Sequence, residues 1–198
     1  NSYFTFEESL IFGAADGNTY MAITKNFPIF EENGFARTHN QRFLFPYLVG
    51  SISYFLNIEP FLSYRIVSIA LLFLLIYLFV TILDLLKINL INKTIAVSFI
   101  IFNPYLLRYY IALPTLINDV TFLISAELLI LGFVTQNKKF SYIGIIVGLF
   151  SRQTAIFYIL TILINKFILK KSLFNIKDFF FLIIIFFIIN YINNYHSL

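Results

Sequence analysis

The chain has 198 residues, of which 60% are hydrophobic, 20% aromatic and 12% charged, and its formal net charge is +4. A soluble domain is about 45–50% apolar and about 25% charged, so lipid must be the solvent for much of this chain. The net charge does not indicate nucleic acid as a partner, since the lysines flank apolar runs and form no patch. With no cysteine and two histidines, the chain has no disulfide or thiolate metal site, and we do not expect a zinc centre.

The first 60 residues are the most polar part of the chain. Asp16-Gly17-Asn18 predicts a turn that leads into a short helix, Thr19 to Asn26, because Asp and Asn accept hydrogen bonds from free amides at a helix start. The composition of Phe27 to Gly34 predicts a loop. Phe43 to Ile58 is apolar but short, and we expect it to form an interfacial helix that lies on the membrane.

Long apolar runs occupy the rest of the chain. Phe61 to Leu83 is the first clear span, because a helix needs about 20 apolar residues to cross the hydrocarbon layer. Thr94 to Leu107 predicts a second span, extended and kinked around Asn103-Pro104. Asn118 to Val134 predicts a third span, and Phe179 to Ile192 is a last run of mostly Phe, Leu and Ile.

The segment Phe140 to Phe167 fits two interpretations. It is one long helix with Arg152 near its centre, or two short helices that turn at this arginine. An arginine at the centre of a span costs about 2.5–3.5 kcal/mol on insertion scales, which favours the turn. The first short helix, Phe140 to Phe150, would rise about 16 Å, too little to cross a bilayer. We therefore expect it to be buried among other helices or to line a cavity.

The basic residues favour two short helices independently. With two short helices and residue 1 outside, every lysine of the connecting loops falls inside, as the positive-inside rule requires. With one long helix, Lys166 and the lysines after Phe167 would lie outside instead. The lysines that two short helices place inside are Lys87, Lys93, Lys138, Lys139, Lys166, Lys170, Lys171 and Lys177. The outer basic residues are Lys25, Arg37, Arg42, Arg65, Arg108 and Arg152. The outer arginines oppose the orientation bias, and the planar guanidinium suits bidentate phosphate binding.

This topology predicts a multi-pass protein of the cytoplasmic membrane. Residues 1–60 would form an extracytoplasmic loop with an interfacial helix, and residues 61–198 a single transmembrane helical bundle. Asp16 lies among small residues, so that a substrate hydroxyl can approach its carboxylate, which would act as a general base. A role as a helix cap would also explain an aspartate at this position. Tyr20, four residues on, would share its side of a helix.

Other polar residues at the outer boundary are candidate ligands. His39 and Arg42 precede an apolar segment and could hold an anionic headgroup, or they belong to a solvated loop. Asp119 opens the third span, where the helix dipole alone would favour it. Arg108, Arg152 and Gln153 lie at outer boundaries as well. Glu127, in the middle of the third span, faces a partner or wet cavity, or is protonated and hydrogen-bonded.

Taken in order, several short motifs resemble those of a known family. They are Gly13-Ala14-Ala15-Asp16-Gly17-x-x-Tyr20, then Arg42-Phe43-Leu44-Phe45-Pro46-x-Leu48, an Arg65-bearing span, Asn118-Asp119 after Pro114, and Gly148-x-x-Ser151-Arg152-Gln153. This order resembles the multi-spanning GT-C glycosyltransferases, which include the protein mannosyltransferases and the lipid A aminoarabinose transferases. The resemblance covers roughly residues 13–170. The family's first span is absent, and we interpret the chain as a fragment of a longer protein.

The resemblance implies an all-α polytopic fold, a GT-C-like helical bundle with a helical first extracytoplasmic loop. It also implies transfer of a sugar from a polyprenyl-phosphate carrier to an acceptor at the extracytoplasmic face. Asp16 would match the family's loop aspartate, Asp119 more loosely a later acidic position, and Arg42 and Arg152, with Arg108, the phosphate ligands. Tyr20, His39 and Gln153 complete the predicted substrate-binding set. No cofactor is required, although a divalent cation could join through carboxylates.

Two other classes of function stay open at the level of sequence. A transporter or flippase for a lipid-linked or anionic solute would use the same arginines for binding without chemistry, and broken short helices suit it. A membrane scaffold is the third class, but it leaves the outer arginines without a role.

Overall fold

The computed structural model describes residues 14–29, 42–104, 106–169 and 174–195, with the backbone alone for residues 14–16, 18, 163–169 and 193–195. Over these residues all regular structure is helical. The α-helices are α2 (Ala14–Lys25), α4 (Leu44–Leu56), α5 (Pro60–Leu85), α6 (Leu90–Phe102), α7 (Leu107–Ala112), α8 (Ile117–Thr135), α9 (Lys138–Ser151), α10 (Ile156–Leu169) and α11 (Ile176–Tyr195). Two short 3₁₀ helices, η1 (Pro114–Leu116) and η2 (Gln153–Ala155), precede α8 and α10.

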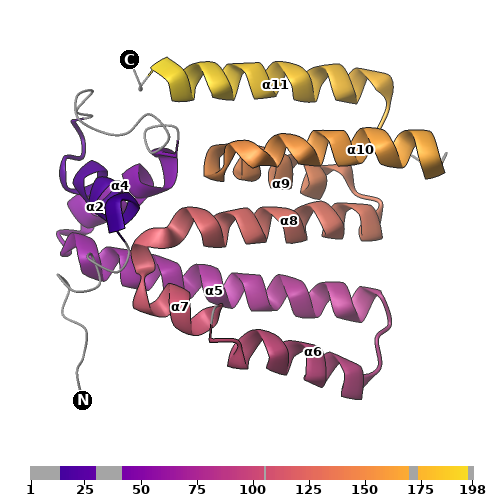
Figure 1. The fold of residues 1–198 in the computed structure, drawn as a ribbon, viewed down its shortest axis with the longest axis horizontal. Helices are drawn as coiled ribbons and strands as arrows, with labels where there is room; N and C mark the ends of the chain where they lie inside the picture. The colour runs from indigo at the N-terminus through magenta and orange to yellow at the C-terminus, as the bar shows by residue number, and fades with distance from the viewer. Residues whose placement is uncertain (1–13, 30–41, 105, 170–173, 196–198) are drawn as a thin grey trace.

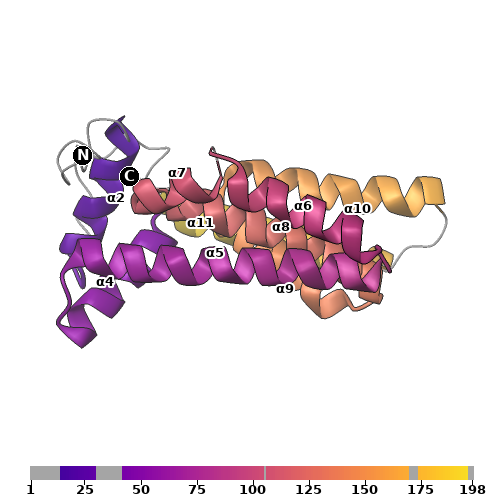
Figure 2. The same ribbon diagram turned by 90° about the horizontal axis from the view of Figure 1, so that it is seen from below.

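The longer helices lie along one common axis. Figures 1 and 2 show α5, α8, α9, α10 and α11 running along the length of the molecule, while α2 and α4 lie together at one end. Among the described residues, three stretches are long and apolar enough to cross a membrane, namely Pro60–Leu85, Leu90–Ala112 and Pro114–Val134. Large apolar side chains cover the outside of the bundle, for example Phe73, Phe99 and Phe187. A membrane protein is the class that this surface fits.

By length and composition, the structure confirms the first and third predicted spans as α5 and α8. It also confirms the second span, interrupted at the predicted Asn103-Pro104, but corrects its bounds from Thr94–Leu107 to Leu90–Ala112. The first helix of this span, α6, begins at Leu90 after the cap residue Asn89, whose Oδ1 accepts a hydrogen bond from the Asn92 amide at 2.8 Å. It ends at Phe102. Asn103 is extended (φ −68°, ψ 115°), because the ring of the following proline disfavours helical backbone before it. The chain resumes as the separate helix α7.

The start of α2 is a second correction. We expected a turn at Asp16-Gly17-Asn18 and a helix from Thr19, but α2 already begins at Ala14 and includes all three residues. A tertiary contact accompanies this earlier start. A Cβ atom on Gly17 would come within 3.0 Å of Thr115 Oγ1, so the glycine lets α2 approach η1 closely. The local turn signal of Asp16 and Asn18 yields to a helix that packs against the bundle.

The two short helices predicted between Phe140 and Phe167 are confirmed. They are α9 and α10, and extended backbone at Arg152 (φ −150°, ψ 137°) separates them. The 14 residues of α9 rise about 21 Å. A Cβ on Gly144 would meet the Ser125 carbonyl oxygen at 2.6 Å, so α9 packs backbone-to-backbone on α8. Close contact through small residues is typical of helix pairs in lipid.

The two ends of the bundle carry different basic residues. The turn from α9 to α10 and the start of α5 lie towards the end that holds α2 and α4, and α7 runs from the break after α6 towards that same end (Figure 1). We call this the arginine end, since its elements carry Arg42, Arg65, Arg108 and Arg152 and a single described lysine, Lys25. The opposite end, the lysine end, carries Lys87, Lys93, Lys138, Lys139 and Lys177. Which end faces the cytoplasm stays a prediction, as does the division at residue 60.

Candidate functional site

Buried hydrogen bonds fix α2 and α4 on the arginine end. The Tyr64 hydroxyl, from α5, donates to the Tyr20 carbonyl oxygen at 3.1 Å. The Thr24 hydroxyl lies 2.8 Å from the Tyr64 hydroxyl and 2.9 Å from the Pro46 carbonyl oxygen of α4. Tyr20 is 2% exposed and belongs to the same apolar cluster as Tyr64 and Val49. Tyr20 therefore anchors α2, and its place in a substrate site stays a prediction.

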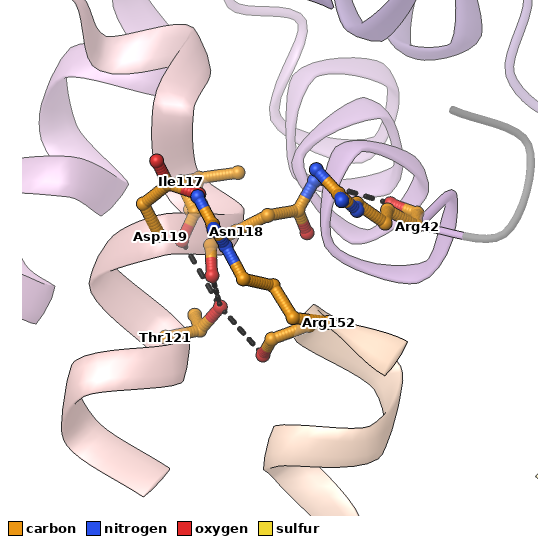
Figure 3. Close-up of polar contacts among 7 residues, drawn as sticks. Arg42, Ile117, Asn118, Asp119, Thr121 and Arg152 are labelled. Atoms are coloured by element: carbon orange, nitrogen blue, oxygen red, sulfur yellow. Dashed lines mark hydrogen bonds and ion pairs between the residues drawn. The ribbon is translucent and has the colours of Figure 1, made fainter. Parts of the chain in front are cut away.

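The first two turns of α8 connect several remote segments (Figure 3). Asn118 Nδ2 donates to the Arg42 carbonyl oxygen at 3.2 Å, which ties the chain before α4 to α8. Ser151 Oγ, at the end of α9, is hydrogen-bonded to Thr121 Oγ1 at 2.9 Å. Gly17 approaches Thr115 directly before α8, as described above. These contacts place α2, the start of α4 and the α9–α10 turn around one helix terminus.

An ion pair between Asp119 and Arg152 lies at the centre of this group (Figure 3). Arg152 Nε donates to Asp119 Oδ1 at 3.0 Å, and Nη2 of the same guanidinium donates to that oxygen too. The arginine side chain is 36% exposed and the aspartate 23%, so both can still meet a ligand. The Arg152 guanidinium also lies 5.9 Å from the centre of the Phe122 ring. The sequence predicted both residues as ligands, but not that they bind each other.

Local sequence explains the position of each partner. Pro114 begins η1 at a helix-start position, where its missing N–H is no loss, and Asp119 falls in the first turn of α8, where the helix dipole favours a carboxylate. Arg152 occupies the extended residue between two helices. Burial alone would lower the pKa of the Arg152 guanidinium, but the hydrogen bond and charge of Asp119 outweigh burial and raise it. Arg152 is therefore a permanent cation.

The remaining predicted site residues are distributed less tightly. The backbone of Asp16 lies in α2, one residue before Gly17, and its side chain is outside what the structure describes. His39 lies outside the described residues altogether. Gln153 is exposed in η2, next to Arg152. Arg108 is exposed in α7, and it lines a cavity away from the Asp119–Arg152 pair.

Two residues outside the predicted set, Asn118 and Arg65, also lie among the polar groups of the arginine end. Asn118 is 1% exposed, and its Oδ1 is buried without a hydrogen-bond partner among the described residues. A buried acceptor without a donor is unusual and destabilising unless a donor reaches it. Arg65 shares the cavity with Arg108. The sequence signals were the Asn118-Asp119 dipeptide at a helix start and the i, i+4 spacing of Phe61 and Arg65.

The intramembrane carboxyl of Glu127 has no described partner for one of its oxygens. Oε2 is buried and makes no hydrogen bond to any described residue. Glu127 lies two helical turns beyond Asp119 on α8, and it belongs to none of the contacts around the helix start. An ionised carboxylate without a partner is costly in an apolar span, which favours the protonated form at this position.

The described residues contain no group of three His, Cys, Asp or Glu side chains that could hold a metal ion. Participation of a divalent cation stays a prediction. Comparisons of the chain with protein-family models, with curated proteins and with solved structures found no match. Its function must therefore be argued from its own residues.

Proposed function

We propose that this chain is a membrane glycosyltransferase of the GT-C type that takes a sugar from a polyprenyl-phosphate carrier. One observation carries the proposal. The start of α8 is in contact with the Arg42 segment and with Arg152, and η1 directly before it is in contact with α2; these three segments are remote in sequence. They are the segments that resemble GT-C motifs. The resemblance in linear order thus has a counterpart in space at one end of an apolar bundle.

The chemistry is a displacement at the anomeric carbon of the sugar. The acceptor hydroxyl oxygen forms a bond to that carbon while the bond from carbon to the carrier phosphate oxygen breaks. The Asp16 carboxylate takes the hydroxyl proton, and the carrier leaves as polyprenyl phosphate. Guanidinium groups of Arg42 and Arg152 stabilise the negative charge that grows on the leaving phosphate.

The ion pair with Asp119 gives Arg152 a defined role in this scheme. Two of its five N–H groups are directed to Asp119 Oδ1, which fixes the plane of the guanidinium. The other N–H groups are available to a phosphate oxygen. A guanidinium held in advance loses less conformational entropy when a phosphate binds. Asp119 is therefore a positioning residue in the proposal, not a base.

The decisive experiment supplies a polyprenyl-phosphate sugar to the purified full-length protein and measures released polyprenyl phosphate. We expect release that depends on an acceptor, falls with Arg152→Lys and is lost with Asp16→Asn. A lysine offers a point charge where a planar fork is required, so carrier affinity should fall about tenfold or more. If both Arg42→Lys and Arg152→Lys behave as wild type, these arginines are not phosphate ligands and the mechanism is wrong.

A transporter or flippase is the second candidate, and the break between α6 and α7 favours it. Transporters of several folds bind their substrate where a membrane helix is interrupted. The pair of short helices α9 and α10 fits this pattern as well. Carrier binding without release of polyprenyl phosphate, across a panel of sugars and acceptors, would select the transporter over the transferase.

A further inference from the structure

A cavity at the arginine end lies apart from the Asp119–Arg152 pair. Its volume is about 540 Å³, and it lies between the start of α5, the end of α6 and the whole of α7. Arg65 and Arg108 line it together with the apolar residues Phe61, Ile101, Leu107 and Ile111. A second cavity of about 300 Å³ continues past Arg65 towards Pro114. The space is large enough for a headgroup and the beginning of an acyl or prenyl chain.

The two arginines of this cavity differ from Arg152. None of the described ion pairs uses Arg65 or Arg108, and none of the described residues that line the two cavities is acidic. Two guanidinium groups that line one cavity without a described carboxylate favour an anion as its ligand. Oxygen atoms of a phosphate match the guanidinium fork in geometry as well as in charge.

Two contacts order the α5 side of the cavity. The Arg65 guanidinium lies over the Phe61 ring, 4.8 Å from its centre, which limits the directions the side chain can take. Ser68 Oγ, one turn further along α5, donates to the Pro114 carbonyl oxygen at 2.9 Å and holds η1 against α5. The break after Phe102 separates α7 from α6 and leaves room between them.

The surroundings of the cavity select a lipid over a soluble ion. Its apolar residues continue into α6, a helix without any buried residue and with Phe99 and Phe102 exposed at 75% and 81%. In a membrane this helix faces acyl chains, so a ligand can enter the cavity sideways from the bilayer. The charged groups then meet the headgroup while the tail stays along α6.

We infer that Arg65 and Arg108 bind the phosphate of a membrane lipid whose tail lies along α6. This site deepens the proposed function, because it names where the product polyprenyl phosphate, a phosphate monoester, is held after it has left Arg42 and Arg152. It rests on that function only for the identity of the lipid. Any lipid with a terminal phosphate monoester has the required chemistry.

The test measures lipid binding to the full-length protein in phosphatidylcholine nanodiscs by native mass spectrometry. The three probes are a polyprenyl monophosphate, a phosphatidic acid and inorganic phosphate. We expect the double variant Arg65→Gln with Arg108→Gln to bind both lipids at least about tenfold more weakly than wild type. The matched control, Lys87→Gln with Lys139→Gln, removes the same charge at the lysine end and should change binding less than about twofold.

Three results would overturn the inference. The first is an equal loss of lipid binding in the two double variants, which would reveal general attraction to charge. The second is no loss of lipid binding in either variant. The third is displacement of the lipids by inorganic phosphate at equal concentration. If the glutamine variant does not fold, Arg65→Lys keeps the charge of this exposed residue and should still weaken lipid binding. The proposed function is judged separately. Sugar release without dependence on Arg65 and Arg108 refutes the site alone, whereas arginine-dependent binding without release refutes the transferase alone.

Discussion

The lysine end and the arginine end of the bundle are both basic, but their charges are arranged differently. At the lysine end, Lys93 Nζ lies 2.5 Å from Asp84 Oδ1, and Lys138 Nζ lies 2.5 Å from Asp178 Oδ2. The first pair connects the consecutive helices α5 and α6, and the second connects α9 and α11. Such partly exposed pairs contribute little to stability. Their charge also sets the orientation of a membrane protein.

Several helices are interrupted at or towards the arginine end. Helices stop at Phe102 and Ser151, and 3₁₀ turns lead into α8 and α10. Arg152 is paired with Asp119, while Arg65 and Arg108 share a cavity without a described acidic partner. Two lysines at the lysine end are in described ion pairs, whereas the arginine end has two arginines that line one cavity. We therefore propose that the lysine end orients the protein in the membrane and that the arginine end recognises the ligand.

The largest expected effect concerns which end is outside. Because the native chain has no cysteine, a single introduced cysteine is the only target of a maleimide. Thr154→Cys at the arginine end should be labelled fully by an impermeant maleimide added to intact cells. Asn137→Cys at the lysine end should be labelled only after the membrane is opened. Both residues are exposed, so accessibility of the side chain does not differ between them. Labelling of Asn137→Cys from outside would reverse the predicted topology.

The next effect concerns catalysis at the arginine end. We expect Asp16→Asn to lower the rate of sugar transfer by about 10²–10⁴-fold, the usual contribution of a general base. The change keeps the shape of the side chain and removes its charge. Asp84→Asn at the lysine end is the matched control and should leave the rate unchanged. A normal rate in the Asp16 variant would reduce this residue to a structural role.

A smaller effect should separate Asp119 and Asp178, two of the three described carboxylates that pair with basic residues. Asp119→Asn leaves the partly buried Arg152 without its charged acceptor, and we expect about 1.5–3 kcal/mol lower stability. Asp178→Asn at the lysine end should cost at most about 1 kcal/mol, because Lys138 donates one hydrogen bond to this carboxylate whereas Arg152 donates two to Asp119; the two pairs are similarly exposed. Chemical denaturation in detergent micelles measures both. Equal losses would mean that the Asp119–Arg152 pair is no more than another surface pair.

The smallest effect is a pH dependence at the lysine end. Burial would raise the pKa of the Asp178 carboxyl, but hydrogen bonds from Lys138 and from the Asn175 amide outweigh it and hold the pKa below its ordinary value. A depressed pKa stabilises the fold above the unfolded value of about 3.9, and this contribution is lost as pH falls below it. We expect the thermal midpoint to drop less between pH 5 and pH 3 in Lys138→Gln than in wild type. An identical drop would show that Lys138 does not shift this carboxyl.

Much of the fold was predictable because it follows from properties that lie along the chain. The apolar runs of α5 and α8 are long enough to cross lipid, whatever they pack against. The turn at Arg152 followed from the cost of a charge in a span and from the side on which the lysines fall. Local signals were less dependable. Asp16 and Asn18 indicated a turn, and packing of Gly17 against Thr115 accompanies a helix instead.

The sequence by itself thus determined the class of protein, the main spans and the separation of arginines from lysines, since hydrophobic length and charge act residue by residue. Only the tertiary structure decided which polar groups meet. Asp119 and Arg152 are 33 residues apart; Asp119 lies on α8 and Arg152 directly follows α9, two helices joined at the far end of the bundle. Arg65 and Arg108 share a cavity because α6 stops after Phe102. Such pairings depend on the faces by which helices pack, and no periodicity within one helix specifies the partner of that face.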